Sequence, residues 1–318
     1  MKVIAITPNF KHDFLASTII EGLYRMGVKV IATDYGNNVE KIYTDKEVIE
    51  HSKDADYAFF FSSKKTDPSP KHYLMSELDL PKVYIDGSEW TYNYHYDSPH
   101  QQSESLIDPS RRKGKPWINT EMYEKCDFYF KRECYPEDAN HNPRMHPLPF
   151  GVVSKNIHIT YEPIAKSIDV LCAFGQINTG MRGLVSKLCR EYRDLKFNIE
   201  IGEWPYDMYI HKMKQSSIVV DAWGSGDCNA RFYEAVANGA CVMHQKPNIL
   251  IPEPFVDGEH CVEFSDEDEF CSKLQYYLDH IKEAREIGKV GQRHALQYHT
   301  SKARAEYIFE VIRNGRNE

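Results

Sequence analysis

The segment Ser217–His244 reads SIVVDAWGSGDCNARFYEAVANGACVMH and decides how the rest of the chain folds. Its apolar, β-branched run at 218–220 suits a buried strand, and Gly224 and Gly226 allow a tight turn at the carboxyl end of that strand. A short helix follows and stops at Gly239, where a second apolar run begins. Strand, glycine-rich turn, helix and strand in this order predict a parallel α/β unit.

The helix of this unit carries a cation and a carboxylate in its first turns. In helical spacing Arg231, Glu234 and Asn238 share one face, and either Asp227 or Asn229 is placed to cap the helix. Open α/β sheets bind ligands at the carboxyl ends of their strands, where a helix N-terminus favours an anion. The pattern therefore predicts an anion site. An i,i+3 ion pair on a solvated helix face is the alternative.

Length and composition favour two globular domains. A chain of 318 residues can form two domains of ordinary size. Its 42% hydrophobic and 27% charged residues are typical of a globular protein, and no apolar run approaches the roughly 20 residues that span a bilayer. The eight cysteines include no CxxC pair, which predicts reduced thiols and a cytoplasmic location. A net charge of −8 argues against a globally basic nucleic-acid binder but allows a local basic groove.

The N-terminal half alternates strands and helices. A strand over 2–7, a helix over 15–24 and a strand over 28–32 form a βαβ start, which predicts a parallel sheet and no signal peptide. The turn after the first strand lacks GxGxxG, which argues against a dinucleotide site. The other elements expected in this half are strands at 57–61, 82–85 and 128–131 and a helix near 71–78.

Side chains at the strand ends of this half are candidates for a catalytic base. Asp86 follows the strand 82–85 and precedes a glycine, a position that faces the interdomain cleft in two-domain α/β enzymes. A carboxylate there can take the proton of a hydroxyl group, whereas capping of a turn is its alternative role. His12 and Asp13, after the first strand, compete for the role of base, and Glu89 is a third alternative.

The stretch 90–117 is polar and irregular and is expected to form a surface loop. Loops of this kind commonly recognise substrates, so Tyr94 and its neighbouring tyrosines are interpreted as an acceptor platform. Arg111, Arg112 and Lys113 form a basic tip. The tip is suited to a phosphate-rich acceptor, but solvation of the loop is the favoured interpretation.

The C-terminal half begins with a strand over 168–174 that enters a turn at Gly175. A helix follows, with Arg182 in its first turn. Backbone N–H groups of such a turn hold phosphate, and an arginine adds a charge-assisted hydrogen bond. The segment 147–151, rich in proline and glycine, is interpreted as the end of the first domain. A linker over 152–167 is expected to follow it.

These residues resemble the nucleotide-sugar half of GT-B glycosyltransferases, with the nearest likeness to bacterial family-1-like enzymes of the CgeB type. The resemblance rests on Arg231-x-x-Glu234, on 239–240, on Asp-Gly-Glu at 257–259 and on Val-Glu-Phe-Ser at 262–265. It implies an α/β protein with two Rossmann-like, doubly wound domains facing across a cleft. The implied domains are 1–152, on the acceptor side, and 153–302, on the donor side; a helix over about 303–318 packs back on the first.

The resemblance also implies roles for the site residues. Glu234 holds the ribose hydroxyls, and Arg231 lies near the phosphates or the base. Gly175, Gly226 and Arg182 contribute to the diphosphate site. The expected reaction moves a hexosyl or pentosyl group from a nucleotide-sugar, for which we expect a UDP-sugar, to a hydroxyl acceptor.

Fixed cations and helix N-termini aimed at the leaving diphosphate stabilise the transition state, so neither a metal ion nor another cofactor is expected. The histidines show no HxxxH or HExxH spacing, and no metal ligands are assigned. With Asp86 as base and no nucleophile on the donor face, inversion is expected.

Other functions stay open at this stage. The acceptor is expected to be a glycan or a protein, and the alternative is a hydroxymethylated pyrimidine in DNA, because phage DNA β-glucosyltransferase is a more distant likeness. In that alternative the basic tip contacts the phosphates along the DNA backbone, and DNA binding weakens steeply as the salt concentration rises. A nucleotide-binding protein without catalysis and a sugar-nucleotide epimerase are the other classes compatible with two Rossmann-like halves. The sequence predicts no oligomeric state.

Overall fold

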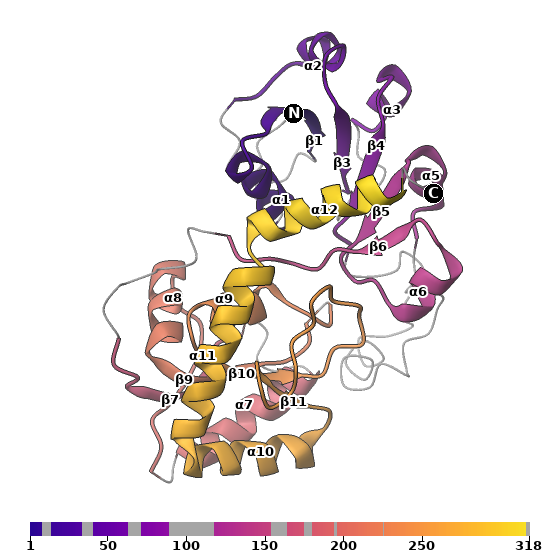
Figure 1. The fold of residues 1–318 in the computed structure, drawn as a ribbon. Coiled ribbons are helices and arrows are strands. Elements are labelled where there is room, and N and C mark those ends of the chain that lie inside the picture. Colours follow the sequence, from indigo (N-terminus) through magenta and orange to yellow (C-terminus); the bar gives the residue numbers. More distant parts are fainter. Residues whose placement is uncertain are drawn as a thin grey trace.

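The protein consists of two parallel β-sheets, each flanked by helices, as expected for an α/β chain with two Rossmann-like domains (Figure 1). The computed structural model describes residues 1–7, 14–33, 41–62, 71–88, 118–153, 164–174, 180–193, 196–224 and 226–315. The strands within each sheet are buried on both faces and rich in β-branched and aromatic residues, which is typical of parallel sheets covered by helices on both sides.

The first sheet has the order β2-β1-β3-β4-β5-β6, and all of its described neighbours are parallel. The chain places β2 on one side of β1 and then β3 to β6 on the other side. This half is therefore doubly wound, as predicted. Its strands are β1 Lys2–Ile6, β2 Lys29–Ala32, β3 Tyr57–Phe61, β4 Lys82–Asp86, β5 Phe128–Lys131 and β6 Met145–Pro147. Its helices are α1 Phe14–Arg25, α2 Asp45–Ser52, α3 Leu74–Glu77, α5 Thr120–Lys125 and α6 Pro136–His141.

The second sheet has the order β11-β10-β9-β7-β8 and is also parallel throughout. The segment 217–244 supplies most of its central strand, β9, most of the neighbouring strand β10, and the helix between them. The strands are β7 Ile168–Cys172, β8 Ile199–Ile201, β9 Ser216–Asp221, β10 Cys241–Gln245 and β11 Val262–Phe264. The helices are α7 Gly180–Arg193, α8 Tyr206–Gln215, α9 Ala230–Ala237, α10 Glu267–Asp279 and α11 Ile281–Tyr298.

The last helix, α12 (Ser301–Gly315), leaves the second domain and lies across the first, where Figure 1 draws it in yellow. It packs against α1, and the two helices approach so closely that a Cβ on Gly22 would overlap the backbone of Ser301. Phe309 of α12 lies 5.9 Å, centroid to centroid, from the ring of Phe59 on β3. The end of the chain therefore completes the core of the domain that begins it.

We predict that truncating α12 destabilises the first domain. Ile308 is fully buried on this helix, so Ile308→Ala should lower the free energy of unfolding by about 2–5 kcal/mol through lost burial and the cavity left behind. Glu310→Ala, on the exposed side of the same helix, should change it by less than about 0.5 kcal/mol. Urea unfolding followed by circular dichroism measures both, and equal effects of the two substitutions would contradict the packing described here.

Candidate functional site

A buried carboxylate joins the two central strands of the second sheet at their carboxyl ends. Asp221 is the last residue of β9, its side chain is fully buried, and it pairs in register with His244 of β10. Its Oδ1 accepts a hydrogen bond of 2.8 Å from the guanidinium Nη1 of Arg231, in the first turn of α9. Its Oδ2 lies 3.0 Å from Nδ1 of His244, an approach bent away from ideal hydrogen-bond geometry. One carboxylate thus holds a cation and an imidazole in place.

The charges of this pair stabilise each other. Burial raises the pKa of Asp221, but the contact with His244 and the guanidinium of Arg231 outweigh it, so the pKa lies below its ordinary value. Burial likewise lowers the pKa of Arg231, and the neighbouring carboxylate of Asp221 more than reverses this. Both groups are therefore ionised in the folded protein at neutral pH.

Glu234 lies one helical turn after Arg231 but is not its partner. Its Oε1 accepts a hydrogen bond of 2.8 Å from the hydroxyl of Tyr206, and its Oε2 accepts one of 2.9 Å from Tyr209. Burial raises the pKa of Glu234, and the two tyrosine hydroxyls and Arg231 only partly offset this. The solvated ion pair considered as an alternative is therefore wrong, because Glu234 is buried and held by α8.

A second arginine lies beside the first. The guanidinium groups of Arg182 and Arg231 lie 5.8 Å and 4.9 Å from the centroid of the Phe174 ring. Burial, and then the charge of Arg231, lowers the pKa of Arg182 to about 10, so it stays a cation at neutral pH. Arg182 lies so close to Gly224 that a Cβ on this glycine would overlap the guanidinium. Gly224 has no positive φ, so the space left by its missing side chain, and not the turn, requires glycine.

The first turn of α9 carries no side-chain cap. Asn229 occupies the N-cap position, but its side-chain amide donates to the carbonyl of Ala222, at 3.2 Å, instead of bonding the helix. Asp227, the other predicted cap, accepts from the backbone and side-chain N–H groups of Asn248. Within the described part of the chain, Nε of Arg231 is buried without a hydrogen-bond partner. Unused N–H donors of this kind at a helix start suit an anion.

The first domain reaches this turn through Glu133, which follows β5. Its carboxylate accepts a hydrogen bond of 2.9 Å from the backbone N–H of Asp227, and the Tyr135 hydroxyl donates one of 3.2 Å to the Asp227 side chain. A Cβ on Gly226 would overlap the Glu133 carboxylate. Gly226, predicted to contribute to the donor site, thus lies where the two domains meet.

Asp86 ends β4, as the sequence indicates, and is fully buried. One carboxylate oxygen accepts from the Tyr129 hydroxyl at 2.7 Å and from the Lys131 ammonium at 3.1 Å. The other accepts from the backbone N–H of Ser88 at 2.9 Å. The backbone contact is the turn-capping arrangement considered as its alternative role. Taking a proton would require the carboxylate to release one of these donors.

Several predicted site residues lie outside the described residues, and their roles stay predictions. They are His12, Asp13, Glu89, Tyr94, Arg111, Arg112, Lys113 and Gly175.

Four residues of the site were not identified from the sequence. Tyr206 and Tyr209 belong to α8, and no local pattern links this helix to Glu234 some 25 residues away. Asp221 and His244 received no predicted role, although a buried strand that ends in a carboxylate is itself a signal. Across the described residues no cluster of three or more histidine, cysteine or acidic side chains is arranged to hold a metal ion, and no helix is long and apolar enough to cross a membrane.

Comparison with known proteins agrees with this arrangement. Residues 178–310 match the family described as glycosyl transferase-like, whereas no curated protein matches the sequence. The fold is similar to that of HepE from Anabaena, solved in complex with UDP, with a TM-score of 0.66 and 11% identity over 99% of this chain and 100% of that one. Sucrose-phosphate synthase from Thermosynechococcus elongatus gives 0.60 and 12% over 98% of both chains. UDP-GlcNAc 2-epimerase from Neisseria meningitidis gives 0.53 and 12% over 99% of this chain and 100% of that one.

Fold and site together indicate the class: the two parallel α/β domains have the GT-B architecture of the solved glycosyltransferases that they resemble. Within that class its match is to the glycosyl transferase-like family, and the matched residues lie in the second domain and α12. The resemblance inferred from the sequence is thereby confirmed.

We predict that Asp221→Asn strongly destabilises the fold. The substitution leaves the guanidinium of Arg231 buried without its counter-charge, so the free energy of unfolding should fall by about 3–5 kcal/mol in a urea titration. As a control, Glu286→Gln breaks an exposed ion pair with Lys289 and should cost less than about 1 kcal/mol. A loss at Asp221 as small as that of the control would show that the buried pair does not hold the site.

Proposed function

We propose that the protein transfers a sugar from a UDP-sugar to a hydroxyl acceptor, with the donor bound at the carboxyl ends of β7, β9 and β10. The observation that carries this proposal is the juxtaposition of the two arginines with Glu234 at the start of α9. Solved structures of HepE that contain UDP, or UDP-glucose, support uridine as the nucleoside.

Each donor-site side chain has a distinct chemical task in this proposal. Arg182 and Arg231 face the diphosphate, and the uncapped first turn of α9 adds N–H donors. As the glycosidic bond breaks, negative charge builds on the leaving diphosphate, and cations already fixed by Phe174 and Asp221 stabilise it without reorganising. Glu234 accepts hydrogen bonds from the ribose diol while Tyr206 and Tyr209 hold its carboxylate in place.

The remaining parts of the proposal concern the acceptor side. With two fixed cations facing the leaving group, the transfer needs no metal ion, and a base on the first domain that activates the acceptor hydroxyl leads to inversion. Asp86 stays a candidate for this base, with Lys131 and Tyr129 as the groups that would orient it. A glycan or protein acceptor and a cytoplasmic location complete the proposal.

We predict that Glu234→Ala weakens UDP binding about ten- to a hundredfold, because a hydrogen bond to a charged group is worth about 1.5–3 kcal/mol. Isothermal titration calorimetry with UDP and with 2′,3′-dideoxy-UDP tests whether the lost affinity comes from the ribose hydroxyls. The native protein should lose affinity for the dideoxy compound, whereas the variant should bind both equally. Glu203→Ala, at an exposed residue just before α8, is the control and should leave both affinities unchanged. A variant that still prefers the ribose diol would refute the role of Glu234.

We predict that Arg182→Gln selectively weakens binding of the diphosphate. Removing one charge-assisted hydrogen bond should lower the affinity for UDP at least about tenfold while leaving that for uridine unchanged. Lys187→Gln, exposed on the same helix, is the matched control and should alter neither. Equal losses for UDP and uridine would mean that Arg182 supports the fold of the site and does not contact phosphate.

A further inference from the structure

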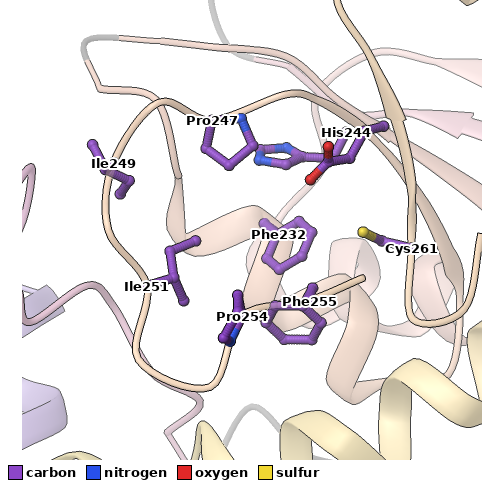
Figure 2. A pocket seen from close by; sticks show the side chains of 9 residues that line it. Phe232, His244, Pro247, Ile249, Ile251, Pro254, Phe255 and Cys261 are labelled. Carbon is purple, nitrogen blue, oxygen red and sulfur yellow. The ribbon is translucent and has the colours of Figure 1, made fainter. Parts of the chain in front are cut away.

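A cavity of about 150 Å³ lies behind the donor-site residues, between α9 and the loop that follows β10. Seven of its nine lining residues are apolar, with His244 and Glu263 as the exceptions. Figure 2 shows the Phe232 ring and the Phe255 ring on one side of the space and Pro247 near His244 on the other. The apolar lining residues are Phe232, Pro247, Ile249, Ile251, Pro254, Phe255 and Cys261.

The imidazole of His244 is the buried polar group of this cavity. Only 2% of the residue is exposed, and its Nε2 is buried without a hydrogen-bond partner among the described residues. Because Nδ1 faces the carboxylate of Asp221, the ring proton belongs on Nδ1, which leaves Nε2 as a lone-pair acceptor. An unpaired acceptor in an apolar space is unfavourable, and a ligand that donates one hydrogen bond would relieve it.

The loop over the cavity has an unusual backbone. Glu253, between Ile251 and Pro254, adopts φ 53°, a left-handed conformation that is uncommon for a residue other than glycine. The ring of His294 on α11 lies within hydrogen-bond distance, 3.0 Å, of the Glu253 carbonyl and holds the loop there. Side chains at the outer part of the loop, including Pro254, are exposed, so the cavity has a route to solvent. Strain maintained beside a cavity is a feature of ligand sites.

We propose that this cavity binds a small ring compound carrying one hydroxyl group, of the phenol or cyclic-alcohol class, whose O–H donates to Nε2 of His244. An apolar protein cavity of about this volume accommodates a benzene-sized molecule. An ordered water needs two to four polar partners, and the lining residues with polar side chains are His244 and Glu263. The cavity adjoins the proposed donor site, because His244 contacts Asp221 and Phe232 follows Arg231 on α9.

Phenol and benzene are the probes, because they share a ring and differ in the hydroxyl group. In calorimetric titrations of the whole protein, phenol should bind about tenfold more tightly than benzene, the value of one buried hydrogen bond. Ile251→Trp, which fills the cavity from its partly exposed edge, should abolish binding of both. Val256→Trp, at an exposed residue of the same loop that does not line the cavity, should leave both affinities unchanged.

Two substitutions at His244 isolate the hydrogen bond. His244→Leu should erase the preference for phenol but keep benzene binding, and His244→Gln, whose amide oxygen reaches the position of Nε2, should restore the preference. Benzene bound as tightly as phenol by the native protein, or phenol binding that survives Ile251→Trp, would overturn the proposal. So would the absence of phenol binding at millimolar concentration. The native protein and the Ile251 variant decide the matter even if His244→Leu fails to fold.

Discussion

The ion pair between Asp221 and Arg231 is the interaction on which the rest of the second domain depends. A fully buried carboxylate at the end of a central strand is unfavourable unless it is paired, and Arg231 pairs it from the first turn of the next helix. That requirement fixes the angle at which α9 leaves the sheet. It also fixes the direction of Glu234, one turn later on the same helix, toward α8.

Two cations and two carboxylates lie close together around this pair. The charge of Arg231 lowers the pKa of Arg182, and the carboxylate of Asp221 raises the pKa of both arginines. The glutamate nearby is committed to two tyrosine hydroxyls and has a raised pKa. In the proposed function, the two arginines supply the positive charge that the diphosphate of the donor would neutralise.

The sequence predicted the architecture because its signals are local. The apolar runs, the glycine at the end of α9 and the helix spacing of Arg231 and Glu234 each lie within a few residues, and the structure has the elements they indicate. It could not predict that Tyr206 and Tyr209 hold Glu234, because that contact joins two helices that are far apart in the sequence. The predicted helix near 71–78 is shorter, with α3 limited to Leu74–Glu77.

Gly226 shows most clearly what the sequence alone could not predict. A glycine between a strand and a helix is ordinarily interpreted as a turn residue, yet neither it nor Gly224 adopts a positive φ. What Gly226 provides is space for the carboxylate of Glu133, which arrives from the other domain and binds the backbone N–H of Asp227. A side chain at this position would displace the Glu133 carboxylate from this contact. The glycine predicted to mark the donor turn therefore also leaves room for a contact between the two domains, and a single residue belongs both to the proposed donor site and to the interface.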